Sequence, residues 1–118
     1  VLQYTGGTTG VSKGAVLLHR NIIANVLQSE AWNGPALKKI PAGEQAVTIC
    51  ALPLYHIFAF TVNMMLSMRM GGANVLIPNP RDLPAVFKEI GKHKFHSFPA
   101  VNTLFNAMAN HPEFNTVD

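Results

Sequence analysis

The chain has 118 residues, of which 48% are hydrophobic and only 13% are charged, with a formal net charge of +3. This length fits one domain or part of one, and the apolar content excludes a disordered chain. The single cysteine excludes a disulfide framework and a cysteine-based zinc site. Because average domains carry about 25% charged residues, this chain has little polar cover. We expect it either to self-associate or to lack part of a partner surface.

Short apolar runs alternate with longer helical patterns along the chain. We expect strands over residues 1–5, 15–18, 46–52, 73–77 and 95–98, and helices over residues 21–32, 57–70, 83–93 and 101–110. Asn33-Gly34-Pro35 is expected to end the first helix, and Asp82 is expected to cap the third. The helix over residues 57–70 is apolar on nearly all sides, which indicates burial.

This alternation predicts an α/β fold, in which β-α units form a mostly parallel sheet with helices on both faces. In such sheets, ligands bind outside the carboxyl ends of the strands. Three segments follow predicted strands and should therefore lie at one edge of the sheet. They are the loop after Thr5, the turn over residues 53–56 and the turn over residues 99–102.

Charge patterning argues against two classes of partner. No residue between Glu44 and Arg69 is charged. This uncharged stretch is longer than the roughly 20 residues that a membrane-spanning helix needs. Pro53 interrupts this segment, however, and favours a buried strand, a turn and a buried helix. The basic residues are scattered apart from a cluster at residues 88–94, which is typical of a solvated helix end. We therefore expect no nucleic-acid partner.

The most informative stretch is Tyr4-Thr5-Gly6-Gly7-Thr8-Thr9-Gly10-Val11-Ser12-Lys13-Gly14. Its glycines let the backbone approach a ligand closely, and exposed N–H groups in such a loop bind anions. The hydroxyl groups add neutral donors, and Lys13 adds a positive charge. Polyphosphate recognition needs this combination. The structural alternative is a hairpin tip rich in turn residues, and the spacing excludes a Walker loop.

The same stretch resembles the phosphate loop of the adenylate-forming, or AMP-binding, superfamily, usually Tyr-Thr-Ser-Gly-Thr-Thr-Gly-x-Pro-Lys-Gly. The departures are a glycine in place of the serine and Ser12 in place of the proline. Further segments resemble other motifs of the family, in the same order: His19-Arg20-Asn21, Leu52-Pro53-Leu54-Tyr55-His56-Ile57-Phe58 and Phe98-Pro99-Ala100-Val101-Asn102-Thr103-Leu104-Phe105-Asn106. The resemblance covers the whole chain and is greatest to bacterial long-chain fatty acid–CoA ligases.

The resemblance implies an enzyme that activates a fatty acid with ATP. Such ligases form an acyl-adenylate, release pyrophosphate and then make a thioester with coenzyme A. We therefore expect ATP, Mg²⁺ and coenzyme A, the last as co-substrate. All of residues 4–14 are expected to contact ATP, mainly at its β- and γ-phosphates, with Lys13 screening their charge. The resemblance also makes Thr5 a candidate ligand of Mg²⁺.

Three residues outside the loop complete the predicted site. The resemblance implies that His56 is a catalytic residue that contacts the substrate and orients its carboxylate. It also implies that Val101 and Asn102 line the acyl site. A core histidine bonded to backbone is the structural alternative for His56. Two other functions stay open: a ligase for another carboxylic acid, and a non-catalytic phosphate-binding α/β module.

We expect residues 1–118 to be an internal part of the large N-terminal domain of such an enzyme, an acyl-CoA synthetase. The rest of the polypeptide is then a partner, and the C-terminal domain lies outside this sequence. Since the family's metal-binding glutamate and catalytic lysine motifs are absent from these residues, we expect no ligase activity from them alone. The expected location is the cytoplasm. Peripheral association with the inner membrane and a homodimer are further expectations.

Overall fold

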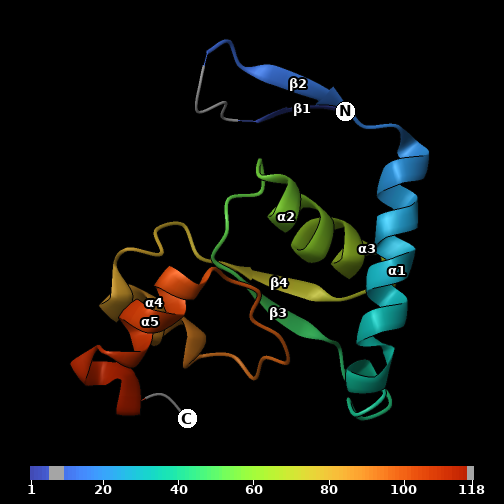
Figure 1. The fold of residues 1–118 in the computed structure, drawn as a ribbon. Helices are drawn as coiled ribbons and strands as arrows, with labels where there is room; N and C mark the ends of the chain where they lie inside the picture. Colours follow the sequence, from blue (N-terminus) through green and yellow to red (C-terminus); the bar gives the residue numbers. More distant parts are fainter. Residues whose placement is uncertain (6–9, 117–118) are drawn as a thin grey trace.

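Two separate pairs of strands organise the chain in the computed structural model, which describes residues 1–5 and 10–116 (Figure 1). Strands β1 (Leu2–Thr5) and β2 (Lys13–Val16) form an antiparallel hairpin. Strands β3 (Val47–Cys50) and β4 (Ala73–Leu76) pair in parallel. The return strand thus begins earlier than predicted, and within the described residues β1 pairs with β2 and does not join the parallel sheet. A short connection favours this local antiparallel pairing, whereas parallel strands need a long crossover.

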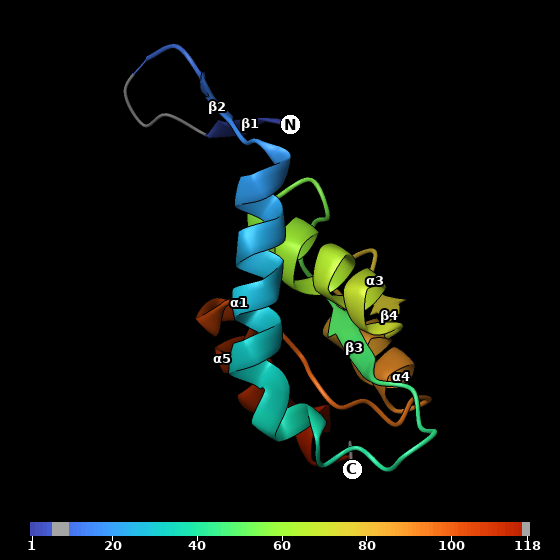
Figure 2. The same cartoon turned by 90° about the vertical axis from the view of Figure 1, so that its right-hand side faces the viewer.

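Helices connect and follow these strands along the chain. They are α1 (His19–Leu37), α2 (Ile57–Ala59), the π-helical turn η1 (Phe60–Met65), α3 (Leu66–Met70), α4 (Leu83–Ile90), α5 (Asn102–Ala109) and the 3₁₀ helix η2 (Pro112–Thr116). The segment α2–η1–α3 is the crossover between β3 and β4. It lies over one side of these strands and packs against α1, while α4 and α5 lie on the other side (Figures 1 and 2).

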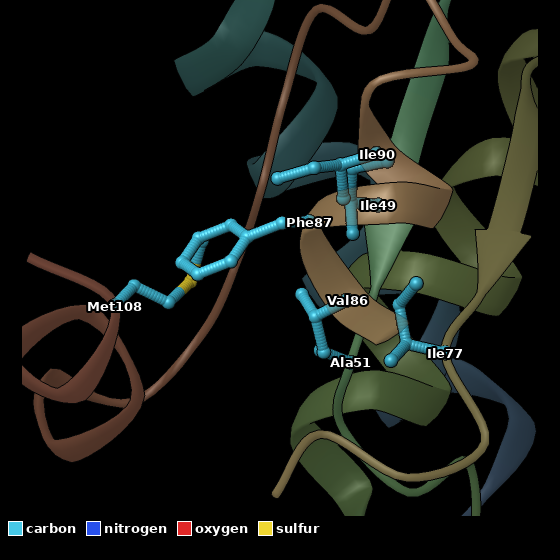
Figure 3. Packing of buried hydrophobic residues seen from close by; sticks show 7 residues of the cluster. All are labelled: Ile49, Ala51, Ile77, Val86, Phe87, Ile90 and Met108. Carbon is cyan, nitrogen blue, oxygen red and sulfur yellow. The ribbon is translucent and has the colours of Figure 1, made fainter. Parts of the chain in front are cut away.

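The larger hydrophobic core lies between the parallel strands and α4. It consists of Ile49, Ala51, Ile77, Val86, Phe87, Ile90 and Met108, which come from β3, the ends of both strands, α4 and α5 (Figure 3). Side chains alternate along β3, so Ile49 faces this core while Thr48 faces α3. The carboxylate of Asp82 accepts a hydrogen bond from the Ala85 N–H at 3.2 Å, which confirms the predicted cap of α4.

The first helix is longer than predicted, because Asn33-Gly34-Pro35 does not end it. Pro35 removes one helical donor, yet the next turn still forms, with the Lys38 N–H donating to the Gly34 carbonyl at 3.0 Å. The Asn33 amide donates to the Ser29 carbonyl at 2.8 Å and strengthens the turn before the proline. Local bonding around Pro35 therefore outweighs the stop signal.

The predicted helix over residues 57–70 forms, but it differs from the prediction in two respects. Its centre is the π-helical turn η1, a rare geometry that is frequent at functional sites. Its outer side is not buried, since the side chain of Met68 is 72% exposed. No helix among residues 10–116 is long and apolar enough to cross a membrane.

Residues 95–98 do not form the last predicted strand and contribute a single parallel bridge between Thr48 and Ser97. The Ile49 N–H donates to the Ser97 carbonyl at 2.9 Å. The next ladder bond would run from residue 99 to the Ile49 carbonyl, but Pro99 has no N–H group. The ladder therefore stops after one bridge.

A polar cluster holds this segment beside β3 despite the short ladder. The His96 ring accepts a hydrogen bond at Nδ1 from the Val47 N–H at 3.1 Å, and the His96 N–H donates to the Val47 carbonyl. The Lys94 ammonium lies 2.8 Å from the Glu44 carboxylate. This hydrogen bond, with a smaller contribution from His96, lowers the pKa of Glu44.

Asn63 connects the π-helical turn to the sheet at the point that Pro99 leaves open. Its side chain is completely buried, and its Nδ2 donates to the Ile49 carbonyl at 3.2 Å. The Asn63 carbonyl in turn accepts a hydrogen bond from Nδ2 of Asn74 in β4 at 3.1 Å. Asn63 thus supplies the donor that Pro99 lacks and ties both parallel strands to one turn of the helix.

We predict that Asn63→Leu destabilises the protein although leucine is more hydrophobic. The change leaves the Ile49 carbonyl without its donor, which costs about 1–3 kcal/mol when such a group is buried. Chemical unfolding of the full-length protein monitored by circular dichroism measures this loss. Met68→Leu, on the exposed side of the same helix, is the control and should change stability by less than about 0.5 kcal/mol. Equal stability of Asn63→Leu and the native protein would contradict the prediction.

Candidate functional site

The hairpin brings the two ends of the predicted phosphate loop together. Its register pairs Tyr4 with Gly14 and Thr5 with Lys13, so the loop leaves and re-enters the hairpin at one place. A Cβ atom on Gly14 would lie 3.2 Å from Cε1 of the Tyr4 ring. Glycine at this position therefore leaves space for the Tyr4 ring across β2.

Part of the predicted loop lies outside the described residues, namely Gly6, Gly7, Thr8, Thr9 and the side chain of Thr5. Of the rest, Gly10 has a φ of 121°, which residues other than glycine rarely adopt. Val11 is 89% exposed. Ser12 is also exposed and leads into β2, which begins at Lys13 and is exposed throughout. The described part of the loop is therefore open to a ligand.

His56 occupies the N-cap of the helix that follows β3. Its Nδ1 accepts a hydrogen bond from the Phe58 N–H at 3.2 Å. Since Nδ1 is the acceptor, the neutral ring carries its proton on Nε2. The His56 residue is exposed, so the ring presents this Nε2–H as a donor. The helix cap thus sets both the orientation and the tautomer of the ring.

The hairpin and the His56 turn are linked directly. The side-chain amide of Gln3 in β1 donates from Nε2 to the Tyr55 carbonyl at 3.3 Å. Figure 1 shows the hairpin on the same side of the molecule as the loop that leads into α2. The structure therefore brings two of the three predicted site segments together.

The third segment begins at the single bridge beside β3. Because Ser97 pairs in parallel with Thr48, the chain from Ser97 onward runs toward the carboxyl end of β3. Val101 is the N-cap of α5 and is 47% exposed, and Asn102 is the first residue of that helix. Residues 99–102 thus follow the same strand direction as the His56 turn, as the sequence predicts.

One cavity lies beside the start of the third segment. It has a volume of about 380 Å³ and lies between α1, the π-helical turn, α3 and β3. Its lining includes Thr48 of β3 together with Ser97 and Pro99. None of His56, Val101 and Asn102 lines it.

The described residues contain no group of three or more histidine, cysteine, aspartate or glutamate residues that could hold a metal ion. Mg²⁺ prefers carboxylate and water oxygens as ligands. The described residues therefore provide no complete magnesium site, and Thr5 remains a prediction.

Two contacts beside the candidate site were not predicted from the sequence. Gln3 gave no signal, because its partner Tyr55 is 52 residues away in the sequence. Asn21 was part of a noted motif without an assigned contact, and its Oδ1 accepts a hydrogen bond from the Leu18 N–H at 3.0 Å. This bond closes the first turn of α1 directly after the hairpin, and an Asn three residues after a helix cap could have indicated it.

Comparison with known proteins assigns the family. The family model described as AMP-binding enzyme matches residues 1–118, and the chain belongs to this family. Over 117 residues it is 56% identical to a long-chain-fatty-acid–CoA ligase of Escherichia coli O157:H7, which covers 99% of this chain and 20% of the relative. A ligase of the same name from Bacillus subtilis is 36% identical over 118 residues, covering 100% of this chain and 20% of the relative. The chain thus spans about a fifth of the length of these curated relatives.

Solved structures agree with this assignment. ATP-bound MatB from Rhodopseudomonas palustris matches with a TM-score of 0.74 and 26% identity, over 94% of this chain and 20% of that one. The N-terminal domain of FACL13 from Mycobacterium tuberculosis matches with a TM-score of 0.74 and 27% identity, over 99% of this chain and 27% of that one. The family resemblance and the α/β fold class predicted from the sequence are therefore confirmed.

We predict that His56→Ala and His56→Asn differ in stability. Alanine removes the acceptor for the Phe58 N–H, and loss of a cap costs about 1 kcal/mol. Asparagine keeps a side-chain acceptor at the cap and should lose only a few tenths of a kcal/mol by this mechanism. Chemical unfolding of the full-length protein measures both variants. Equal losses in the two would show that the cap does not contribute.

Proposed function

We propose that the protein containing this chain is an ATP-dependent long-chain fatty acid–CoA ligase. The observation that carries the proposal is the 56% identity to an enzyme of that name over 99% of the chain. The geometry supports it, because the phosphate-loop hairpin and the His56 turn lie together at the start of α2. A cytoplasmic location is part of the same proposal.

The proposed reaction has two steps. An oxygen of the fatty acid carboxylate attacks the α-phosphorus of ATP, which forms the acyl-adenylate and releases pyrophosphate. The thiolate of coenzyme A then attacks the acyl carbonyl carbon, and AMP leaves with the bonding electrons. The first step needs charge stabilisation on the phosphates more than covalent help from the protein. These residues are expected to lack activity alone, since the family's later motifs lie outside them.

Within that reaction, residues 4–14 hold the phosphates through backbone N–H groups and hydroxyls, and Lys13 supplies a positive charge. The Nε2–H of His56 donates to a carboxylate oxygen and orients the other oxygen toward phosphorus. Val101 and Asn102 line the acyl site. The Thr5 hydroxyl is our proposed ligand for Mg²⁺ from this chain, and the bound ion would further neutralise the phosphates.

A second candidate is a ligase for a different carboxylic acid. The 4-coumarate–CoA ligase 3 of Arabidopsis thaliana is 32% identical over 117 residues, so the same elements occur in a protein named for an aromatic acid. The glycine that replaces the family serine, together with residues 101–106, favours a long acyl chain instead. A non-catalytic phosphate-binding module is disfavoured by membership in an enzyme family.

Pyrophosphate exchange into ATP by the full-length protein tests the proposal. We expect exchange with palmitate and much less with 4-coumarate. Lys13→Ala should raise the KM for ATP by about tenfold or more, because a charge-assisted hydrogen bond contributes about 1.5–3 kcal/mol. His56→Asn should lower the exchange rate while keeping the helix cap.

The matched control is Lys92→Ala, which removes an exposed lysine at the end of α4 that pairs with Glu89. It should leave the KM for ATP unchanged. Exchange with 4-coumarate but not with palmitate would replace the proposal with the second candidate. Absence of exchange with every acid tested would reject an adenylate-forming activity.

We also propose peripheral association with an anionic membrane, through one exposed apolar face of α1. Ile23 and Leu27 lie one turn apart on the same face of this helix and are 54% and 47% exposed. Lys38 and Lys39 follow the end of the helix. Exposed apolar side chains together with lysines on one helix are typical of surfaces that bind the membrane interface.

Sedimentation of the full-length protein with vesicles tests this surface. We expect binding to vesicles that contain phosphatidylglycerol, weaker binding to pure phosphatidylcholine, and a loss of several-fold for Leu27→Ser. Trp32→Ser, on the opposite face of α1, is the control and should bind as the native protein does. Binding that is unchanged in Leu27→Ser would exclude the face that carries Ile23 and Leu27. The proposed homodimer is tested by light scattering of the same samples, where a monomer mass would reject it.

A further inference from the structure

Gln3 lies between the two substrate segments of the candidate site. It belongs to β1, two residues before Thr5, where the predicted phosphate loop begins. Its side chain leaves the hairpin and donates to the carbonyl of Tyr55, the residue before His56. A single side chain thus touches both the segment proposed to bind ATP and the segment proposed to bind the carboxylate.

The contact acts on the peptide group that carries His56. The Tyr55 carbonyl and the His56 N–H belong to the same planar peptide unit. The His56 N–H donates to the Pro53 carbonyl at 2.9 Å, while the Tyr55 carbonyl accepts from Gln3 at 3.3 Å. Bonds at both ends of one rigid plane fix its orientation. The Nδ1 bond orients the ring relative to this backbone, so the direction of its Nε2–H depends both on that bond and on the plane of the peptide.

On the other side, Gln3 follows the position of the hairpin. It stands opposite Ala15 in the register, next to the pair formed by Tyr4 and Gly14. Its Nε2 also lies 3.4 Å from the Tyr4 carbonyl. A shift of the hairpin on phosphate binding would therefore move the Gln3 amide, and with it the hydrogen bond to the Tyr55 carbonyl.

We propose that Gln3 is a positioning residue that couples ATP binding at the β1–β2 hairpin to carboxylate binding at His56. The inference rests on the proposed function. ATP bound at the hairpin fixes the position of the Gln3 amide, which holds the Tyr55–His56 peptide in place before the acid arrives. The acid then binds to a turn whose peptide is already held, so each ligand raises the affinity of the other. Linkage requires the two effects to be equal.

Calorimetry on the full-length protein tests the coupling, with palmitate and α,β-methylene-ATP as probes. The native protein should bind palmitate at least fivefold more tightly when the ATP analogue is saturating, and the analogue should gain the same factor from palmitate. Gln3→Leu is similar in size but has no donor, so this factor should fall toward one. Gln3→Glu keeps the shape without an N–H donor and should show the same loss, which guards against misfolding of the leucine variant.

Gln45→Leu is the matched control. Gln45 makes the same kind of bond, from Nε2 to the Gly71 carbonyl at 2.8 Å, but beside the amino end of β3. This variant should lower the melting temperature and leave the coupling factor unchanged. A native coupling factor in both Gln3 variants, no coupling in the native protein, or an equal loss in Gln45→Leu would overturn the inference. Failure of pyrophosphate exchange with every acid would instead reject the proposed function.

Discussion

The position of the helical segment α2–η1–α3 on the sheet depends on one absent hydrogen-bond donor. Pro99 cannot donate to the Ile49 carbonyl, and the buried amide of Asn63 does so in its place. This hydrogen bond fixes the rotation of the π-helical turn over β3 and β4, and the bond from Asn74 to the Asn63 carbonyl adds a second attachment. The N-terminal end of the same helical segment carries His56. The buried hydrogen bond from Asn63 to the Ile49 carbonyl therefore helps to position His56 at the surface.

The elements that the sequence predicted well are those with strong local causes. Apolar runs rich in β-branched residues placed β3 and β4, and Asp82 followed by Pro84 placed the start of α4. The position of His56 at the end of a turn was also predictable, because Pro53 ends the preceding apolar run. Each of these signals lies within a few residues of the feature that it indicates.

The failures have causes that the local sequence pattern does not reveal. Pro35 does not end α1, because helical bonds form on both sides of it. The predicted strand over residues 95–98 is reduced to one bridge, because the next ladder donor would be Pro99, which has no N–H group. For the candidate site, the loop residues were named from their pattern, whereas the Gln3 contact joins residues that are 52 apart and leaves no local trace.

The hairpin has a further consequence through the way it is attached. Its ladder consists of four residue pairs, and every residue of β2 is exposed, whereas Ile49 and Cys50 of β3 are buried. Segments with few buried groups open at much lower free energy than the core. The hairpin can therefore detach and return as one cooperative unit while the β3–β4 layer stays closed. Under the proposed function, polyphosphate bound at this hairpin would be released without unfolding of the β3–β4 layer.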